Sequence, residues 1–264
     1  MIKDTLRILS LGAGVQSSTL ALMIEKGEIP MVDASIFADT QAESKETMDF
    51  LIWLKSKLSY PVYIISKGNL TDQLLNSNFP IAPFYSFNKL TGKKGLMLRQ
   101  CTNDYKVQPI IKKVRELLGY KKGQRVKKGT KVEMLMGISK DEVFRAKKNR
   151  MPYIENIYPL IEKKYSRQDC LNWFNQHYDA KPPRSACIYC PFKNDKEWTD
   201  LKKNNPSEWN EVVEFDKKIR NNSRDKNQEV FLHRSCLPIS EVDFDRKEDQ
   251  LNLFQNECEG LCGV

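Results

Sequence analysis

Histidine and long apolar runs are the two features that this sequence most clearly lacks. Only two histidines, His177 and His233, occur among the 264 residues, which nearly excludes a metal site built mainly from imidazole. No apolar run approaches the roughly 20 residues of a membrane helix. The N-terminal segment shows neither the hydrophobic region nor the cleavage site of a secretion signal. These absences favour a soluble, cytoplasmic protein without a membrane partner.

Basic residues, by contrast, are abundant. Lysine and arginine number 43 against 34 acidic residues, which gives a net charge of +9. This balance suits an anionic partner, either a nucleotide or a nucleic acid, although much of the charge can simply be solvated surface. Six basic residues lie in a connector at 119–131. Seven cysteines in a chain without a secretion signal indicate metal binding or redox chemistry rather than a disulfide framework.

Apolar patterning predicts alternating strands and helices in the first half of the chain. The expected strands are 6–11, 31–37, 62–65 and 132–138, and the expected helices are 17–26, 44–58 and 104–118. Such alternation implies a parallel sheet with right-handed crossovers. Residues 68–100 lose this rhythm, and we expect them to form a long loop or an inserted lobe.

The second half of the chain is rich in short helical segments, prolines and cysteines. One helix is expected to begin at Ser166, where Asp169 completes a pair like a capping box, and two more are expected at 195–204 and 207–219. Cys170 is expected in the core, and His177 at the carboxyl end of its helix. The predicted organisation is a nucleotide-binding α/β core over 1–165 and a helical, cysteine-containing region over 166–264, packed as one structural domain.

The sharpest local signal is the small-residue turn Gly12-Ala13-Gly14 between a predicted strand and a predicted helix. Small residues let the backbone approach a ligand closely, and the free N–H groups of the next helix point at the turn. Ser17 and Ser18 add hydroxyl donors, so the segment suits a phosphate. It matches neither G-x-x-x-x-G-K-[ST] nor G-x-G-x-x-G, and a glycine turn can also serve packing alone.

The segment 10–18 resembles the PP-loop of the ATP pyrophosphatase and phosphoadenosine phosphosulfate (PAPS) reductase superfamily. The ATP-using form of that loop, S-G-G-x-D-S, aligns with 12–17, where this chain has Gly12, Ala13 and Gln16 instead of serine, glycine and aspartate. Gln16 is typical of the PAPS reductase branch, whereas Ser17-Ser18 resembles the ATP-using branch. Further segments similar to the family follow in the family's order: 37–47, 99–109, 137–145, 158–160 with 166–170, 185–191 and 257–262.

The resemblance implies an adenine nucleotide α-hydrolase-like, Rossmann-like α/β fold: a mainly parallel sheet with helices on both faces and a cysteine-bearing C-terminal region at the active edge. It also implies an enzyme that binds ATP or PAPS, with Mg²⁺ if ATP is used. The implied nucleotide-binding residues are Ser10, Gly12, Ala13, Gly14, Gln16, Ser17, Ser18, Asp39, Thr40, Arg99 and Gly137. The implied catalytic residues are Cys258, Lys106 and Arg145.

Cys187 and Cys190 have the spacing that lets two thiolates reach one metal ion. A lone C-x-x-C pair is ambiguous between redox, zinc and iron–sulfur roles, and it can also be purely structural. By the resemblance, Cys101 and one tail cysteine, Cys262 or else Cys258, complete a four-thiolate site. Analogy favours a [4Fe-4S] cluster, and Zn²⁺ fits the spacing equally well. Cys236 has no partner motif.

Two enzymatic functions and one non-enzymatic function fit these residues. A PAPS-reductase-like enzyme would use the Cys258 thiolate, on a tail folded back to the phosphate turn, to attack the sulfonate, and a thioredoxin-like partner would reduce the product. An ATP-dependent thiolation enzyme would adenylate an oxygen of a nucleic acid, tRNA or DNA, and sulfur from a cluster or a cysteine desulfurase would displace AMP. A regulatory module that binds a nucleotide without catalysis is the third. Gln16 and the tail favour the first, and Ser17-Ser18 and the basic surface favour the second.

Overall fold

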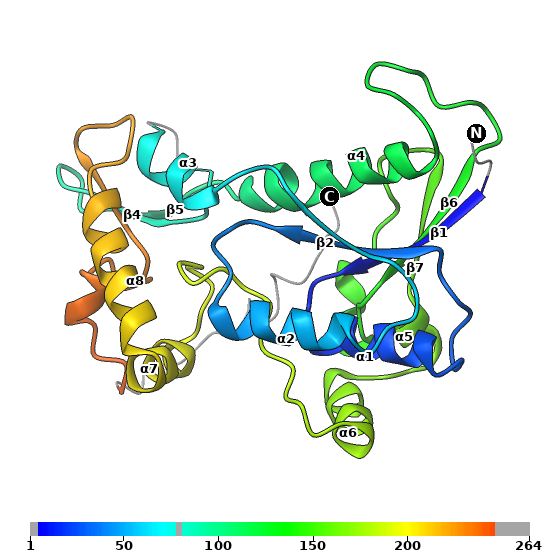
Figure 1. Cartoon of the computed structure of the whole chain (residues 1–264). Helices are drawn as coiled ribbons and strands as arrows, with labels where there is room; N and C mark the ends of the chain where they lie inside the picture. The colour runs from blue at the N-terminus through cyan, green and yellow to red at the C-terminus, as the bar shows by residue number, and fades with distance from the viewer. Residues whose placement is uncertain (1–4, 78–80, 246–264) are drawn as a thin grey trace. The chain divides into compact units, whose positions relative to one another are not determined.

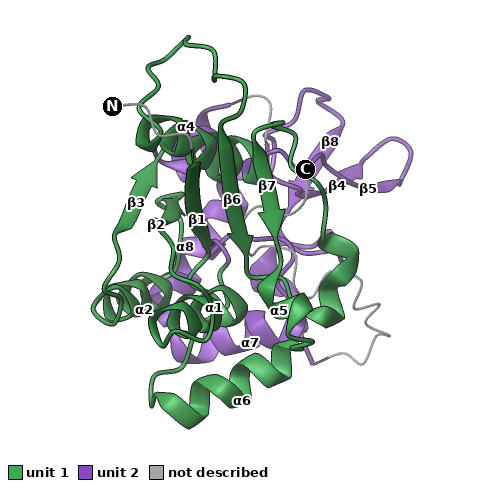
Figure 2. Ribbon diagram, turned by 90° about the vertical axis from the view of Figure 1, so that its right-hand side faces the viewer, with its two compact units in different colours: residues 1–67, 102–185, 258–264 green, residues 68–101, 186–257 purple. Residues whose placement is uncertain are grey.

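The computed structural model describes residues 5–77 and 81–245 of the chain (Figure 1). These residues form two compact units (Figure 2). Unit 1 comprises 5–67 and 102–185, and unit 2 comprises 68–77, 81–101 and 186–245. Within the described ranges, no helix has the length and apolar character needed to cross a membrane.

Unit 1 is built on a five-stranded parallel sheet with the strand order β3-β2-β1-β6-β7. The strands are β1 (Thr5–Leu11), β2 (Ala34–Asp39), β3 (Val62–Ser66), β6 (Lys131–Met136) and β7 (Ile154–Ile157). Ser10 of β1 pairs with Ile36 on one side and with Met136 on the other. The order therefore reverses between β1 and β6, the place where open α/β sheets bind their ligands.

Helices cover both faces of this sheet. The helices α1 (Val15–Glu25), α2 (Lys45–Lys55), α5 (Pro159–Glu162) and α6 (Arg167–His177) pack on one face. The other face is covered by α4 (Gln108–Leu117), which follows a short π-helix, η1 (Asn103–Val107). Leu9 and Leu11 enter the first core and Ile8 the second, because successive strand residues point to opposite faces. The predicted α/β fold with a parallel sheet is confirmed.

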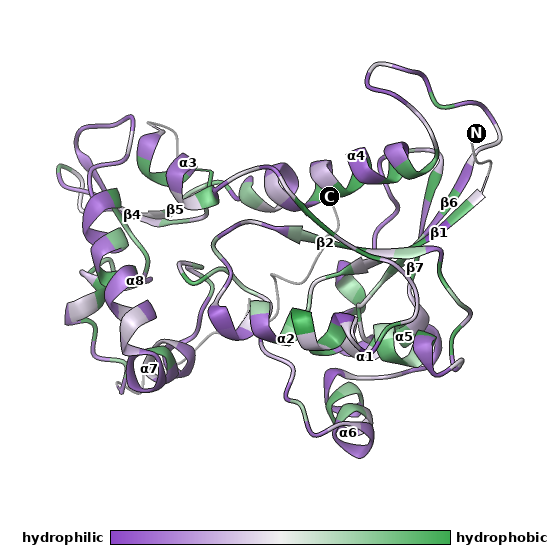
Figure 3. Ribbon diagram, viewed as in Figure 1, coloured by the Kyte–Doolittle hydropathy of each residue, from purple (hydrophilic) through white to green (hydrophobic). Residues whose placement is uncertain are grey.

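The helices of unit 1 differ in how much of their surface they bury. Residues 15–24 of α1 are all buried, so this helix lies fully inside the unit. In contrast, α4 and α6 carry one hydrophobic and one hydrophilic side (Figure 3). The capping box predicted at Ser166 and Asp169 is present at the start of α6, Cys170 is fully buried, and the ring Nδ1 of His177 lies 2.7 Å from the Trp173 carbonyl.

Unit 2 contains an antiparallel sheet of order β5-β4-β8 and three helices. Its elements are α3 (Leu70–Asn76), β4 (Tyr85–Asn88), β5 (Lys94–Leu96), α7 (Asp195–Asn204), α8 (Pro206–Ile219) and β8 (Gln228–Phe231), with a 3₁₀ turn, η3 (Ile239–Glu241). The Tyr189 ring stacks on Phe215, with centroids 4.0 Å apart. Residues 68–100 thus belong to a lobe, as the loss of strand–helix rhythm predicts.

The boundaries between the two units differ from the expected boundary at residue 165. They fall after residues 67, 101 and 185. The helix α6 belongs with the first unit because Phe174 lies in the core beneath α1 and the Thr19 hydroxyl donates to the Cys170 carbonyl at 3.3 Å. Strand β4 pairs with β8, which joins the lobe at 68–101 to the C-terminal half of the chain. Long-range packing and strand pairing of this kind are not encoded in local sequence patterns.

Candidate functional site

The turn between β1 and α1 lies at the point where the strand order reverses. Ala13 takes a left-handed conformation with φ 56°, and Gly14 is the extended N-cap of α1. The Ser17 hydroxyl accepts a hydrogen bond from the Gly12 N–H at 3.2 Å. No side chain caps α1 in the described structure, and its first turn has no acidic residue. The first N–H groups of α1 therefore form an anion-binding end.

Two buried hydroxyls accompany this turn. Ser10 is 3% exposed and Ser18 is fully buried. Neither hydroxyl has a hydrogen-bond partner among the residues that the structure describes. A buried hydroxyl without a partner is costly, and most such groups in native proteins are satisfied by water or a ligand. The Ser18 hydroxyl, on the first turn of α1, is thus available to a bound phosphate.

The end of β6 approaches the start of α1 very closely. A Cβ atom built on Gly137 would lie 2.7 Å from both the N and the Cα of Ser17. These are backbone atoms, so no side-chain rotation can relieve the clash. Gly137 therefore lets the two segments that flank the reversal point touch each other, which is a structural reason for a glycine at a predicted nucleotide-binding position.

The Gln16 side chain joins three segments of unit 1. Its Oε1 accepts from Nη1 of Arg167 at 2.6 Å, and its Nε2 donates to Oε2 of Glu142 at 3.1 Å. Glu142 lies in a short 3₁₀ segment, η2 (Lys140–Arg145), and also accepts from Nη1 of Arg145 at 2.8 Å. Both ends of the amide are therefore engaged. Arg145, a predicted catalytic residue, is brought to the phosphate turn through Glu142.

A second group of polar residues follows β2. Lys106 lies 3.2 Å from Oε1 of Glu43, and the Thr40 hydroxyl donates to the same oxygen at 3.1 Å. Asp39 accepts from the Gln41 N–H at 2.7 Å. The carboxyl ends of parallel strands meet at one edge, so Asp39 and Thr40 at the end of β2 lie at the edge that bears the turn after β1. Lys106, on η1, reaches the same edge through its ion pair with Glu43. The structure thus brings Asp39, Thr40 and Lys106 to the predicted edge.

Two buried ion pairs dominate the electrostatics of this edge. In the pair of Lys106 and Glu43 the side chains are 8% and 1% exposed, and in the pair of Arg145 and Glu142 they are 6% and 3% exposed. Charges removed from water need such partners, and the loss of one partner typically costs about 3–5 kcal/mol. The acids thus hold two cations in place beside the turn.

Three of the predicted cysteine ligands, Cys101, Cys187 and Cys190, belong to unit 2, as does Arg99. The N–H of Cys190 donates to the Cys187 carbonyl at 3.1 Å, which places both residues on one tight turn. Cys190 is 8% exposed, and the guanidinium of Arg99 lies 5.4 Å from the centroid of the Phe192 ring. No three histidine, cysteine or acidic side chains form a metal-ligating group within the described ranges. Cys258 and Cys262 lie outside those ranges, so the four-thiolate site stays a prediction.

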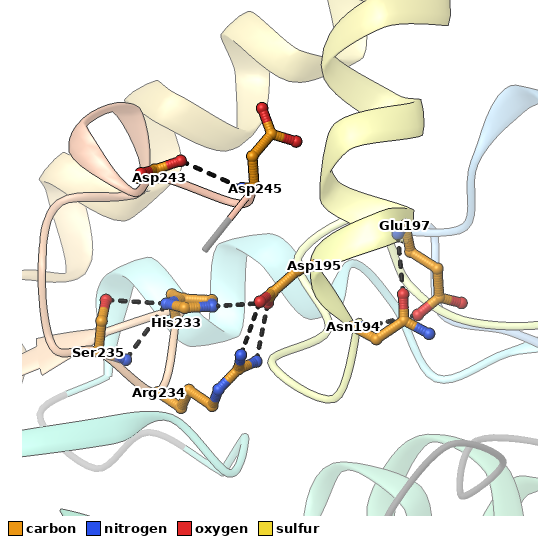
Figure 4. A network of polar contacts seen from close by, with 8 residues as sticks. All are labelled: Asn194, Asp195, Glu197, His233, Arg234, Ser235, Asp243 and Asp245. Atoms are coloured by element: carbon orange, nitrogen blue, oxygen red, sulfur yellow. Dashed lines mark hydrogen bonds and ion pairs between the residues drawn. The ribbon is translucent and has the colours of Figure 1, made fainter. Parts of the chain in front are cut away.

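Unit 2 contains a polar network that the sequence patterns did not predict (Figure 4). Arg234 binds both carboxylate oxygens of Asp195, at 2.7 and 2.6 Å, and Nε2 of His233 lies 3.0 Å from Asp195 Oδ1. Nδ1 of His233 accepts the Ser235 N–H at 3.2 Å, so the ring proton resides on Nε2 and is donated to Asp195. Asp195 begins α7, 38 residues before His233, and that separation hides the contact from local patterns.

The acid at the centre of this network stays ionised. Burial opposes the charge of Asp195, but hydrogen bonds from Arg234 and His233 outweigh burial and hold the pKa of the carboxyl below its usual range. Tyr85 lies within electrostatic reach of this network and of two cysteines: burial raises the pKa of its phenol, Arg234 lowers it, and Cys190 and Cys236 raise it.

Similarity to known proteins lies in the fold and not in the sequence. The sequence matches no protein-family model and no curated protein. The fold is similar to the crystal structure of PAPS reductase from Candida auris in its phosphate complex, with 15% sequence identity and a TM-score of 0.40 over 67% of this chain and 73% of that chain. The assignment of a function therefore rests on the residues described above.

The close approach at Gly137 gives a first testable prediction. We expect Gly137→Ala to lower the free energy of unfolding by roughly 1–3 kcal/mol, because its methyl group has to displace the Ser17 backbone. Urea denaturation measures the loss, and titration with ATP and PAPS tests whether the predicted nucleotide binding is lost as well.

Gly27→Ala is the control for this variant. Gly27 has φ +77° but open space around it, so its substitution should cost only backbone strain, about 1 kcal/mol, and leave nucleotide binding intact. If Gly137→Ala has the stability and binding of wild type, the end of β6 and the start of α1 do not approach each other as closely as the structure shows.

The second prediction concerns pH. Since the pKa of Asp195 is lowered on folding, its stabilising contribution is present above the ordinary aspartate value of about 3.9 and is lost as pH falls through the lower folded value. We expect Asp195→Asn to lower the free energy of unfolding by about 1–2 kcal/mol at neutral pH. In urea titrations, the difference from wild type should shrink below about pH 4. A difference that is constant with pH would contradict this assignment.

Proposed function

We propose that this protein is a PP-loop enzyme that binds an adenine nucleotide, ATP or PAPS, at the turn 12–18 and carries out sulfur transfer or sulfonucleotide reduction. The observation that carries the proposal is the uncapped N-terminus of α1 beside the buried, unpartnered hydroxyl of Ser18. This arrangement lies at the reversal of strand order in a parallel sheet, where a phosphate is best held.

The residues of the edge divide the binding task. Backbone N–H groups of the turn and the hydroxyls of Ser17 and Ser18 would donate to phosphate oxygens. Arg145 supplies a planar guanidinium and Lys106 a compact ammonium, and each can neutralise phosphate charge. Both cations have acidic partners, Glu142 and Glu43, so a phosphate would share them with these acids.

Sulfonucleotide reduction is the first form of the activity. Gln16, the residue type of the PAPS reductase branch, supports it because its neutral amide bonds both Arg167 and Glu142, whereas an aspartate would place a second carboxylate against Glu142. In this form the Cys258 thiolate attacks the sulfonate sulfur of PAPS, and the nucleotide leaves. The resulting Cys-S-sulfonate is reduced by a thioredoxin-like partner. Cys258 lies outside the described residues.

Thiolation of a nucleic acid is the second form. The Ser17-Ser18 pair supports it, because the buried Ser18 hydroxyl adds a donor for an ATP phosphate, with Mg²⁺ accompanying the nucleotide. The excess of nine basic charges also suits a nucleic acid acceptor. A cysteine desulfurase is then the expected sulfur source.

Bound metal remains part of the proposal. Cys187 and Cys190 share one tight turn, which fits two ligands of a [4Fe-4S] cluster or of Zn²⁺. Cys101 of the same unit and Cys262 of the tail are the further ligands that we propose. A cluster would supply redox or sulfur chemistry, whereas Zn²⁺ would stabilise the fold.

The third prediction tests the nucleotide site. We expect Gly14→Val to abolish binding of ATP and PAPS while the protein stays folded, since a β-branched side chain at the N-cap of α1 fills the phosphate space. Calorimetric titration of both nucleotides into wild type and variant measures the loss, and tighter binding of one nucleotide identifies the substrate. Circular dichroism checks the fold. A folded variant that binds both as wild type does would refute the site.

The fourth prediction tests the metal site. We expect the Cys187→Ser and Cys190→Ser variants, purified without oxygen, to lose the iron and acid-labile sulfide, or the zinc, found in wild type. Cys236→Ser is the matched control, because this buried cysteine of unit 2 is outside the proposed ligand set and should keep full metal content. Wild-type protein with neither iron nor zinc would remove the proposed centre.

A further inference from the structure

Three adjoining hollows on unit 1 have several lysine and arginine residues in their lining. Their volumes are about 750, 870 and 640 Å³, Arg115 lines the first and second, and Pro152 lines the first and third. We call their basic lining residues the basic strip: Lys112, Arg115, Lys121, Lys122, Arg125, Lys127, Lys128, Lys147 and Lys148. Only two acids, Glu116 and Glu155, line the same hollows. The surface is therefore strongly positive and continuous.

The strip residues of the connector 119–130 lie at the opposite edge of the sheet from the turn 12–14, whereas Lys147 and Lys148 lie nearer the carboxyl end of β7, where Tyr158 contacts the Lys147 backbone. Most of the strip is carried by this connector, which leaves α4 and enters β6 at Lys131 (Figure 1). Gly137 follows the other end of β6, so the connector and the turn are separated by about one strand length, roughly 20 Å. A ligand held by the connector is thus distinct from a nucleotide held at the turn.

The connector that carries the basic strip is a folded platform. The Tyr120 hydroxyl lies 3.2 Å from the Thr130 hydroxyl and accepts the Lys127 N–H at 3.0 Å. The Arg115 guanidinium donates to the Gln124 carbonyl, which ties the connector to α4. Tyr120 and Thr130 are each 6% exposed. A backbone that is ordered before binding lowers the entropic cost of binding. A flexible basic segment would lose its conformational freedom only when the ligand binds.

The lining of the hollows indicates which polyanion fits. Single strands need exposed rings on which bases stack, but Tyr120 is buried, and Tyr153 and Tyr158 are only partly exposed. The Tyr158 hydroxyl is also engaged with the Lys147 carbonyl. Lysine and arginine on an open surface instead match phosphates that are spaced along a backbone. We propose that the basic strip binds the sugar–phosphate backbone of a nucleic-acid duplex, independently of base sequence.

This inference does not depend on the proposed reaction. It rests mainly on the connector 119–130 at the amino edge of the sheet, whereas nucleotide binding rests on the turn 12–18 at the carboxyl edge. Lys131 lines none of the three hollows and is not part of the strip; it pairs with Glu155 at 3.3 Å and with Glu133 at 3.9 Å.

The test compares duplex binding by wild type and by the triple variant Arg125→Ala, Lys127→Ala, Lys128→Ala. These side chains are exposed and line the first hollow, so their removal should leave the fold intact. Fluorescence anisotropy with a short mixed-sequence DNA duplex, between about 50 and 200 mM salt, gives the dependence of affinity on salt. We expect the variant to bind about tenfold or more weakly, with a logarithmic salt slope shallower by about three.

The control variant is Lys196→Ala, Lys203→Ala, Lys218→Ala, which removes the same charge from exposed positions of α7 and α8. It should keep the affinity and nearly the full slope. A duplex of different sequence and an RNA duplex should bind alike, because both present a continuous phosphate backbone.

Three outcomes would overturn the inference: equal loss in both triple variants, no loss in the strip variant, or tighter binding of a single strand than of the duplex. Nucleotide titration of the strip variant separates the two proposals. Unchanged ATP or PAPS binding alongside lost duplex binding assigns the loss to the basic strip, whereas Gly14→Val should show the reverse pattern.

Discussion

The amide of Gln16 is the interaction on which the candidate site depends, because it connects the phosphate turn to two segments that are distant in the sequence. It accepts from Arg167 at the start of α6 and donates to Glu142, which in turn holds Arg145. The amide does both at once. An aspartate, as in the ATP-using form of the loop, would set a second carboxylate against Glu142 and have no donor to offer. Glutamine instead of aspartate at position 16 thus fits its two hydrogen-bond partners, Arg167 and Glu142.

Charged residues of both signs meet at the carboxyl edge of unit 1. Arg145, Arg167 and Lys106 lie there with Glu142, Glu43 and Asp39, so the edge has no concentrated positive field. Buried acids keep the cations fixed and charged when no ligand is bound. The same acids compete with a bound anion for the cations. Such an arrangement favours a ligand whose phosphate also accepts hydrogen bonds from the N–H groups of α1. The cations alone would bind it weakly, because they remain paired with Glu142 and Glu43.

Much of the fold was predictable from sequence because its signals are local. The apolar run before Gly12 and the capping box at Ser166 each act within a few residues, and both predicted elements are present. The short strand β7 and the pairing of β4 with β8 were not predictable, since four-residue strands carry little pattern and their partners are far away. The turn at Gly12 was identified from its composition, whereas the bonds between Gln16 and Glu142 and between Asp195 and His233 arise from tertiary packing alone.

The two ends of the unit 1 sheet use charge in opposite ways. At the carboxyl edge, Lys106 and Arg145 are buried and paired with acids. Cations fixed in this way suit a small anion that has to be held in one orientation. At the amino edge the connector 119–130 carries most of the basic strip on open hollows with few acids, which suits a long anion held by many weak and salt-sensitive contacts. Strand length keeps these edges apart, so substitution of one set of charges need not alter the other. A parallel sheet can therefore carry an orienting site and a tethering surface in one unit, because its two edges are built from different loops.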